Sequence, residues 1–354
     1  MWKRTRDRIE LSLINGENSL LPPDTGEPDA FPLQITPEQD AAFRAIQELL
    51  AIPLESFACV RRFGDARELI AHLHSNPLND HRWAFRGHSN ASWNLETSIE
   101  RLSKEYPNSF RLGAEEYVRQ SFKRRAYHYL NYLPAEKDEL EWMALMRHHG
   151  APTRLLDWTR SPYVAAFFAV AEAKEDGVSA IWAVDIDTVK DAAIHLLSQN
   201  GVIEKPQTGD FSFSDRDVFE QVFLRETEPS IVAPVQPLRT NERITSQQGL
   251  FLCANPSIWG FEFGLKQILK SDRERVEAWY VEKRLGEKPF MPERLFKLYI
   301  EPQARSALLR ELHRMNINYA TLFPGLDGFA RSLGTNITVS GHEYLFQSEF
   351  DSRV

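Results

Sequence analysis

The chain has 354 residues, enough for one large domain or two ordinary ones, and its 42% hydrophobic content can fill a sizeable core. The formal net charge of −8 argues against general nucleic-acid binding, which usually requires a basic surface, although a local basic groove remains compatible with it. The apolar run Val164–Ala171 is much shorter than the about 20 residues of a membrane span, and the N-terminus has no secretory signal pattern. We therefore expect a cytoplasmic protein without a membrane partner.

The cysteines and histidines predict no metal site and no disulfide. Cys59 and Cys253 lack the spacing of either, so we expect two core thiols in a reducing compartment. His148 and His149 are adjacent, and on a helix adjacent side chains point about 100° apart, which prevents them from sharing one metal ion.

Residues 1–76 are expected to form an N-terminal arm followed by helices. The Pro-, Gly- and Asn-rich stretch 15–35 is typical of an irregular arm. Thr36 then resembles an N-cap before a helix that runs to about Leu50. A short strand over 58–63 and a helix capped by Asp65 follow.

The rest of the chain alternates between predicted helices and strands. The stretch 200–217 has the composition of a mobile loop, and 323–328 is rich in turn residues. This alternation indicates an α+β or α/β body. Hydrophobic spacing predicts helices over 115–132, 138–149, 271–285 and 303–315 and one starting at Ser161, and strands over 83–87, 178–184, 249–253 and 295–300.

The tripeptide Phe85-Arg86-Gly87 ends one of these strands. Alternation places Trp83 and Phe85 on one face, and Ala84 and Arg86 on the other. A glycine lets a ligand approach the backbone closely, and an arginine can hold a phosphate or carboxylate by two parallel hydrogen bonds. The alternative is a buried ion pair of Arg86 with a carboxylate such as Asp157.

A second motif, Gly150 to Pro162, concentrates polar groups among apolar ones and ends at a helix N-terminus, which suits an anion. Its hydroxyls are expected to donate hydrogen bonds to a ligand, and its indole to stack on a planar ring or to support the cavity wall. Alternatively, its charged residues tie the loop to the core. The residues concerned are Thr153, Arg154, Asp157, Trp158 and Thr159.

Gln248 precedes Gly249 at the start of a predicted strand, so its amide is expected to face the same cleft. Arg243 is a candidate helper, whereas Glu242 is not a convincing general base. The common phosphate-loop, dinucleotide, hydrolase-elbow and zinc-protease signatures are absent from the sequence.

These motifs resemble the FRG domain family, which is named for the (F/Y)RG tripeptide. The resemblance covers about Trp83 to Ala330 and includes Trp93-x-Leu95-x-x-Ser98, the block around PTRLLDWT, Gln248-Gly249-x-Phe251 and Leu322-Phe323-Pro324-x-Leu326-Asp327-Gly328. It places the FRG domain at 77–345, with core motifs in 83–185 and a C-terminal half, 240–345, that completes the sheet. His149 departs from the glutamine that members often carry. Members occur in bacteria and phages, some in settings that suggest toxins or phage defence.

The order of the motifs is also similar to that of ADP-ribosyltransferases. In those enzymes a first strand carries an Arg-Gly-like or His-Gly pair for nicotinamide and its ribose, a hydroxyl-bearing loop and Ala/Phe-rich helix follow a second strand, and a Glu or Gln begins a third. The likeness implies an α+β fold with a mixed, mostly antiparallel central sheet flanked by helices and an N-terminal helical extension. It implies NAD as the ligand, with Arg86 and Gln248 as catalytic residues. The implied binding residues are Gly87, His88, Thr153, Arg154, Asp157, Trp158 and Thr159.

The third position departs from the transferase pattern, because a neutral glutamine balances a developing positive charge less well than a glutamate. An ADP-ribosyl-transferring or NAD-consuming enzyme with a macromolecular acceptor is the first hypothesis. The second is a catalytically inert module that senses a nucleotide or a phage component. The third is an RNA-acting enzyme that uses Arg86 with His88 or His149 as an acid/base pair.

Overall fold

The computed structural model describes residues 37–106, 108–206, 211–257, 259–283 and 292–335. The predicted arm over 15–35 and the predicted cap Thr36 lie outside these ranges. The first described helix, α2, spans Pro37–Ala51.

Within the described ranges, seven strands form one sheet in the order β1-β7-β4-β2-β3-β6-β5. Only the β1–β7 pair is parallel, and the other neighbours are antiparallel. The predicted α+β class with a mostly antiparallel sheet is therefore confirmed. The strands are β1 (Cys59–Phe63), β2 (Trp83–His88), β3 (Leu155–Thr159), β4 (Ser179–Asp185), β5 (Val232–Val235), β6 (Gly249–Ala254) and β7 (Leu295–Ile300).

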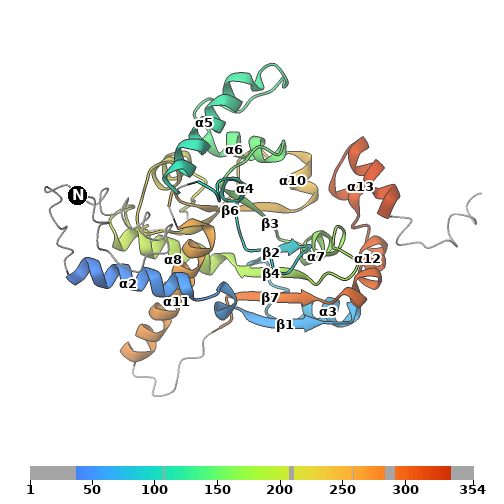
Figure 1. Ribbon diagram of the computed structural model, residues 1–354, viewed down its shortest axis with the longest axis horizontal. Helices are drawn as coiled ribbons and strands as arrows, with labels where there is room; N and C mark the ends of the chain where they lie inside the picture. The colour runs from blue at the N-terminus through green and yellow to red at the C-terminus, as the bar shows by residue number, and fades with distance from the viewer. Residues whose placement is uncertain (1–36, 107, 207–210, 258, 284–291, 336–354) are drawn as a thin grey trace, which may run out of the picture.

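Helices connect the strands and cover both faces of the sheet (Figure 1). The longer ones are α3 (Ala66–Leu73), α5 (Asn108–Ala126), α6 (Glu139–His148), α7 (Pro162–Val170), α8 (Ile186–Gln199), α11 (Gly260–Glu282) and α12 (Arg305–Arg314). The short ones are α4 (Ser98–Leu102), α9 (Arg216–Phe219), α10 (Glu242–Ser246), α13 (Tyr319–Leu322), the 3₁₀ turns Leu54–Phe57 and Pro302–Ala304, and a π-helical turn at Glu220–Leu224.

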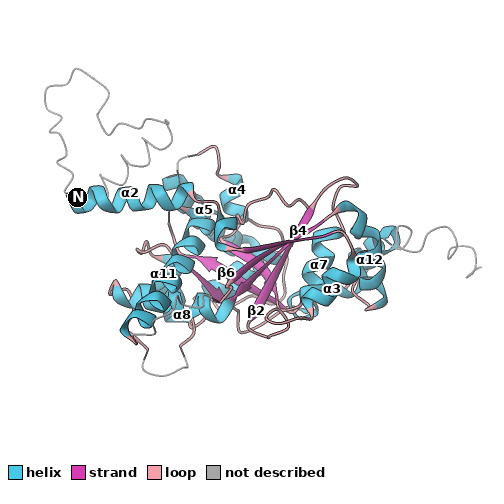
Figure 2. Cartoon of the chain, turned by 90° about the horizontal axis from the view of Figure 1, so that it is seen from below, coloured by secondary structure: helices cyan, strands magenta, loops and turns pink. Residues whose placement is uncertain are grey.

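Helices lie on opposite sides of the sheet (Figure 2), and their apolar residues form two layers with the strands. On one face α8 and α11 pack on the strands through residues such as Val189 and Leu265, and α6 joins them near β3. On the other face α3, α7 and α12 contribute residues such as Leu69, Phe167 and Leu308. Because helices bury both faces of the sheet, the sequences of its strands are nearly continuous apolar runs.

Several helix ends form where local sequence signals predict them. Asp65 caps α3, Asp138 caps α6 and Ser161 caps α7, each by accepting a backbone N–H with its side chain. Pro162 occupies the first helical position of α7. Gly150, just past α6, has φ +81°, the left-handed conformation that ends many helices.

Other boundaries differ from the sequence expectation. Helix α5 starts before residue 115 and ends at Ala126 rather than Tyr132, and α11 starts at Gly260 rather than Ser271 because its apolar first half packs under the sheet. Residues 326–335 are helical, so this helix begins inside the turn element predicted at 323–328. In the stretch 200–217, the described Ile203 and Phe213 are buried in the core.

The sheet also draws on the segment before residue 77. Strand β1 pairs with β7 over five residues, and Leu69 and Leu73 of α3 join the same core as α7 and α12. The part of the N-terminal segment from Cys59 onward is therefore built into the body that carries the motifs.

Candidate functional site: an opening between two central strands

Strands β2 and β3 separate almost as soon as they meet. They share a single residue pair, Phe85 with Thr159, whereas β2 pairs with β4 at six positions and β3 with β6 at five. Beyond Phe85 and Thr159 the sheet is open at its centre. An opening there exposes backbone groups that a continuous ladder would satisfy.

The side chain of Arg86 bridges this opening. Its Nη1 donates to the backbone carbonyl of Asp157 over 2.6 Å, and its Nε donates to Nε2 of His88 over 3.2 Å. A guanidinium therefore takes the place of a strand-to-strand hydrogen bond. It has five N–H donors, and the remaining ones have no hydrogen-bond partner among the described residues.

A cavity of about 420 Å³ lies at the opening. Its walls come from β2 and the loop after it, from β3, from the end of α6, from α7 and from the α10–β6 turn. Its lining residues include Phe85, Arg86, Gly87, Ser89, Trp93, Arg147, His148, Asp157, Trp158, Thr159, Phe168, Glu172, Arg243 and Gln247.

Positive charge dominates the floor of this cavity. Arg86, Arg147 and Arg243 line the cavity, together with the carboxylates of Asp157 and Glu172. Asp157 accepts from Nε of Arg147 over 2.8 Å and makes an ion pair with the same guanidinium. Three guanidinium groups and two carboxylates thus line the cavity, and the excess of positive charge favours an anionic ligand.

Arg86 and Asp157 are both charged at neutral pH. Burial lowers the pKa of Arg86 to about 10, partly offset by Asp157, so the group remains a cation. Burial would raise the pKa of Asp157, but Arg147 and Arg86 outweigh it and hold that pKa below its usual value. Burial also lowers the pKa of Arg243 from its very high starting value.

His88 is a neutral hydrogen-bond acceptor in this arrangement. Burial and the neighbouring Arg86 lower its pKa to about 3, and its Nε2 accepts from Arg86. Such a group does not exchange a proton near neutral pH, so it positions Arg86 rather than acting as an acid/base partner. Of the two adjacent histidines, His148 lines the cavity, whereas His149 is exposed and is not part of the wall.

The family model of the FRG domain matches residues 81–177, from just before β2 to the residues ahead of β4. The chain carries an FRG domain. No curated protein and no solved structure matches the chain. The FRG match contains Arg86, Arg147 and Asp157, while Arg243 and Gln247 come from the part of the chain beyond it.

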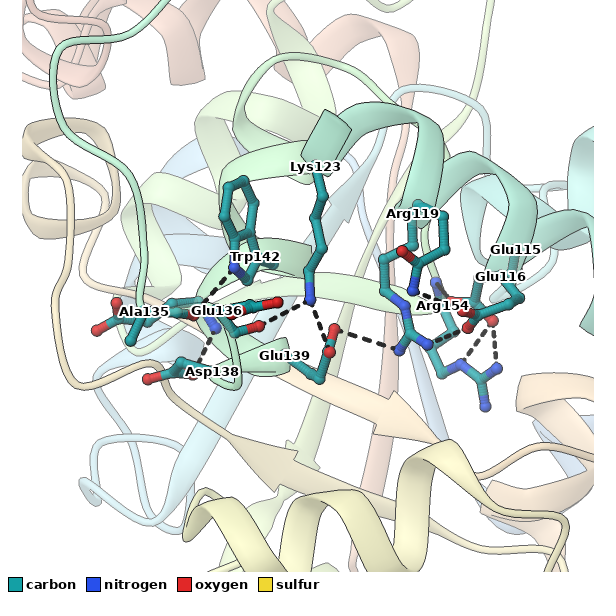
Figure 3. Close-up of polar contacts among 12 residues, drawn as sticks. Glu115, Glu116, Arg119, Lys123, Ala135, Glu136, Asp138, Glu139, Trp142 and Arg154 are labelled. Atoms are coloured by element: carbon teal, nitrogen blue, oxygen red, sulfur yellow. Dashed lines mark hydrogen bonds and ion pairs between the residues drawn. The ribbon is translucent and has the colours of Figure 1, made fainter. Parts of the chain in front are cut away.

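Two predicted ligand-binding residues of the FRG domain lie away from the cavity. Thr153 is fully buried, and its backbone N–H donates to Oγ of Ser98 over 2.9 Å. Arg154 donates through Nε to Oε2 of Glu115 over 2.7 Å, and its backbone N–H donates to Oε1 of the same carboxylate (Figure 3). The structure therefore assigns Arg154 to a buried ion pair that fastens β3 to α5.

Gly87 has a structural role that the sequence did not reveal. It lines the cavity, but a Cβ there would overlap the carbonyl oxygen of Ala165 and lie 2.5 Å from the amide nitrogen of Ala169. The glycine of the FRG tripeptide thus lets α7 lie directly on β2. Close approach of a helix, rather than of a ligand, explains the absence of a side chain.

The hydroxyl of Thr159 and the indole of Trp158, both on β3, have contacts within the protein. Thr159 donates its Oγ1 hydrogen to the carbonyl of Gln247 over 2.6 Å and accepts from the N–H of Ser161. Trp158 is only 3% exposed and belongs to the apolar core. Both residues line the cavity, and their contacts within the protein make them part of its wall rather than ligand-binding groups.

The structure brings Gln247 rather than Gln248 to the cavity. Gln248 is exposed and has φ +48°, a left-handed conformation that lets the chain turn from α10 into β6. Gln247 lines the cavity, and its Nε2 donates to the carbonyl of Leu322 over 2.9 Å. The amide at the third strand is therefore one residue earlier than predicted.

Sequence reasoning assigned no site role to Arg147, His148, Trp93 or Phe168. Arg147 lies in the last turn of α6, where a cation also suits the helix dipole, and nothing local distinguishes it from a solvent-facing arginine. Trp93 carried a signal, because it belongs to the motif after the tripeptide. The structure shows it 54% exposed on the cavity wall, with its ring centre 6.1 Å from that of His88 in a T-shaped arrangement.

The described ranges contain no helix long and apolar enough to cross a membrane. They also contain no group of three or more His, Cys, Asp or Glu side chains arranged to hold a metal ion.

Proposed function

We propose that the cavity between β2 and β3 binds NAD or a related nucleotide, and that the protein is an ADP-ribosyltransferase-like or NAD-consuming enzyme of toxin or phage-defence type. The observation that carries the proposal is the convergence of Arg86, Arg147 and Arg243 on a cavity at an open seam of the sheet. The three strands that bear the motifs, β2, β3 and β6, are consecutive neighbours in that sheet.

The charges and the aromatic residues of the cavity fit the two parts of a dinucleotide. A pyrophosphate carries two negative charges and offers oxygen acceptors in the geometry that guanidinium forks recognise. Trp93 and Phe168 add rings for a base or a nicotinamide, and Trp93 is the more exposed of the cavity's two tryptophans. Trp93, more than Trp158, is therefore the surface on which a planar ring would stack.

The proposed reaction breaks the bond between the nicotinamide nitrogen and the ribose carbon. Nicotinamide leaves with the electron pair, and water or a hydroxyl of a macromolecular acceptor adds to the ribose carbon and releases a proton. Positive charge develops on the ribose, and the carboxylates on the wall, Asp157 and Glu172, are the groups able to balance it. The Oε1 of Gln247 would accept from a ribose hydroxyl.

A catalytically inert nucleotide sensor is the second candidate. It is favoured by the engagement of Asp157 with Arg147 and by the amide that stands where transferases carry a glutamate. An FRG domain of this kind would bind the nucleotide tightly and turn none over.

The proposal includes a cytoplasmic location. Cys59 and Cys253 are free thiols, in keeping with a reducing bacterial cytoplasm.

The test is NAD consumption and NAD binding by the full chain, by Arg86→Ala, and by Arg216→Ala as an exposed arginine away from the cavity. Turnover that is lost in Arg86→Ala and kept in Arg216→Ala supports the enzyme. Tight binding without turnover, even with cell extract as a source of acceptors, supports the sensor. If the unmodified protein neither binds nor consumes NAD, the proposal fails.

A further inference from the structure

A second surface combines aromatic rings with unpaired positive charge. It lies at the C-terminal end of α5 and in the turn that follows, which project from the body of the molecule (Figure 1). We call it the α5 tip and define it by Arg124, Arg125, Tyr127, His128, Tyr129 and Tyr132.

The cations of α5 divide into two groups. Arg119 and Lys123 are mostly buried and face α6, where Glu139 lies 2.7 Å from Lys123 and 3.5 Å from Arg119 (Figure 3). Arg119 also pairs with Glu116 of α5 itself. Arg124 and Arg125 are exposed, and neither has an ion-pair partner among the described residues. No Asp or Glu occurs from residue 124 to 135. The tip is therefore locally basic in a chain of net charge −8.

The aromatic rings of the tip are open to solvent. Tyr127, Tyr129 and Tyr132 are 61%, 82% and 61% exposed. The rings of Tyr127 and His128 lie 3.9 Å apart, and the His128 ring lies 6.4 Å from that of Tyr129. A third cation joins from another part of the chain, since the guanidinium of Arg239 lies 5.2 Å from the ring centre of Tyr132.

We propose that the α5 tip binds single-stranded nucleic acid. Exposed rings offer faces on which unpaired bases stack, and the flanking guanidinium groups can pair with backbone phosphates whatever the base sequence. A duplex hides its base faces, so the same surface would hold a duplex only through phosphates.

This surface is separate from the cavity between β2 and β3, and the inference does not rest on the function proposed for that cavity. The probes are fluorescein-labelled 15-mers of oligo(U) and oligo(dT), a duplex of the same length, and labelled poly-glutamate. Binding to the full chain is followed by fluorescence anisotropy at several salt concentrations.

We expect the single strands to bind more tightly than the duplex and poly-glutamate. Arg124→Ala/Arg125→Ala should weaken single-strand binding about tenfold at low salt and reduce the slope of log K against log salt by about 1.4, as expected for two lost phosphate contacts. Tyr127→Ala/Tyr129→Ala should weaken binding by a similar factor with an unchanged slope, because stacking carries no charge. Preference for oligo(U) or oligo(dT) identifies RNA or DNA.

The matched control is Arg67→Ala/Arg310→Ala, which removes two exposed arginines from other surfaces. Thermal unfolding of every variant checks that the fold is intact. The proposal is overturned if the unmodified protein binds no single strand, if the control loses as much affinity as the tip variants, or if poly-glutamate binds as well as the oligonucleotides, which would indicate an acidic protein partner.

Discussion

Two arginines that look alike in the sequence have opposite surroundings in the structure. Arg154 meets a carboxylate, Glu115, that satisfies it and leaves it inside a closed ion pair. Arg86 meets a backbone carbonyl and a neutral histidine, neither of which cancels its charge, at the edge of a cavity. A buried arginine therefore signals a ligand site only where the protein leaves its charge uncompensated.

Asp157 is intermediate between the closed ion pair of Arg154 and the open position of Arg86. Asp157 is ion-paired with Arg147, yet its side chain is 45% exposed and lines the cavity. Asp157 restrains Arg147 through its carboxylate and Arg86 through its backbone carbonyl. It does not neutralise all three guanidinium groups of the cavity. Substitutions at Glu115 and Asp157 therefore distinguish the closed ion pair from the open site.

The largest effect is expected from Gly87→Ala. Overlap with the backbone of α7 cannot be relieved by moving a flexible side chain, so we expect a loss of about 4 kcal/mol or more in the free energy of unfolding. Chemical denaturation measures it. Gly113→Ala in α5, where a Cβ meets nothing within 4 Å, is the control and should gain about 1 kcal/mol. Equal stability of Gly87→Ala and the unmodified protein would contradict this packing.

The next effect is expected from Glu115→Ala. The change leaves the guanidinium of Arg154 buried without its carboxylate, which should lower the free energy of unfolding by about 3 kcal/mol. Nucleotide binding measured below the unfolding transition should stay within twofold of the unmodified protein. If the variant folds normally but loses nucleotide binding, Arg154 is a ligand-binding residue and not a structural one.

A pH-dependent effect is expected from Asp157→Asn. Arg147 and Arg86 outweigh burial and lower the pKa of Asp157 below 3.8, so its ionised form stabilises the folded state above about pH 4 and that contribution is lost as the pH falls through the folded-state pKa. The variant should be less stable than the unmodified protein at pH 7, and the gap should close below about pH 4. Urea unfolding at a series of pH values measures the gap. If the stability difference between Asp157→Asn and the unmodified protein does not change with pH, the contact of Asp157 with Arg147 does not depend on the charge of the carboxylate.

The smallest effect on stability is expected at the α10–β6 turn. Gln247→Ala should weaken nucleotide binding several-fold, whereas Gln248→Gly should leave both binding and stability nearly unchanged, within about 1 kcal/mol, because glycine accepts φ +48°. Calorimetric titration with NAD compares the two. If Gln248→Gly weakens NAD binding more than Gln247→Ala does, Gln248 supplies the ligand-binding amide.

Much of the secondary structure could be predicted because its signals are local. Asp65, Asp138 and Ser161 cap the helices that they precede, and Gly150 ends α6 as expected. The first half of α11 escaped prediction because its apolar residues lack a clean amphipathic spacing when both the sheet and α8 cover them. Its boundary depends on burial, which a local pattern does not encode.

The sequence by itself determined five of the seven described strands, several helix caps and the FRG tripeptide, since each depends on residues a few positions apart. Strands β3 and β5 were not predicted. Only the tertiary structure decided which carboxylate each arginine meets, that β2 and β3 part after one residue pair, and that α7 rests on Gly87. The physical reason is that charge compensation and close packing are set by partners far away in the chain. Glu115 lies 39 residues from Arg154, and Arg86 lies 71 residues from Asp157.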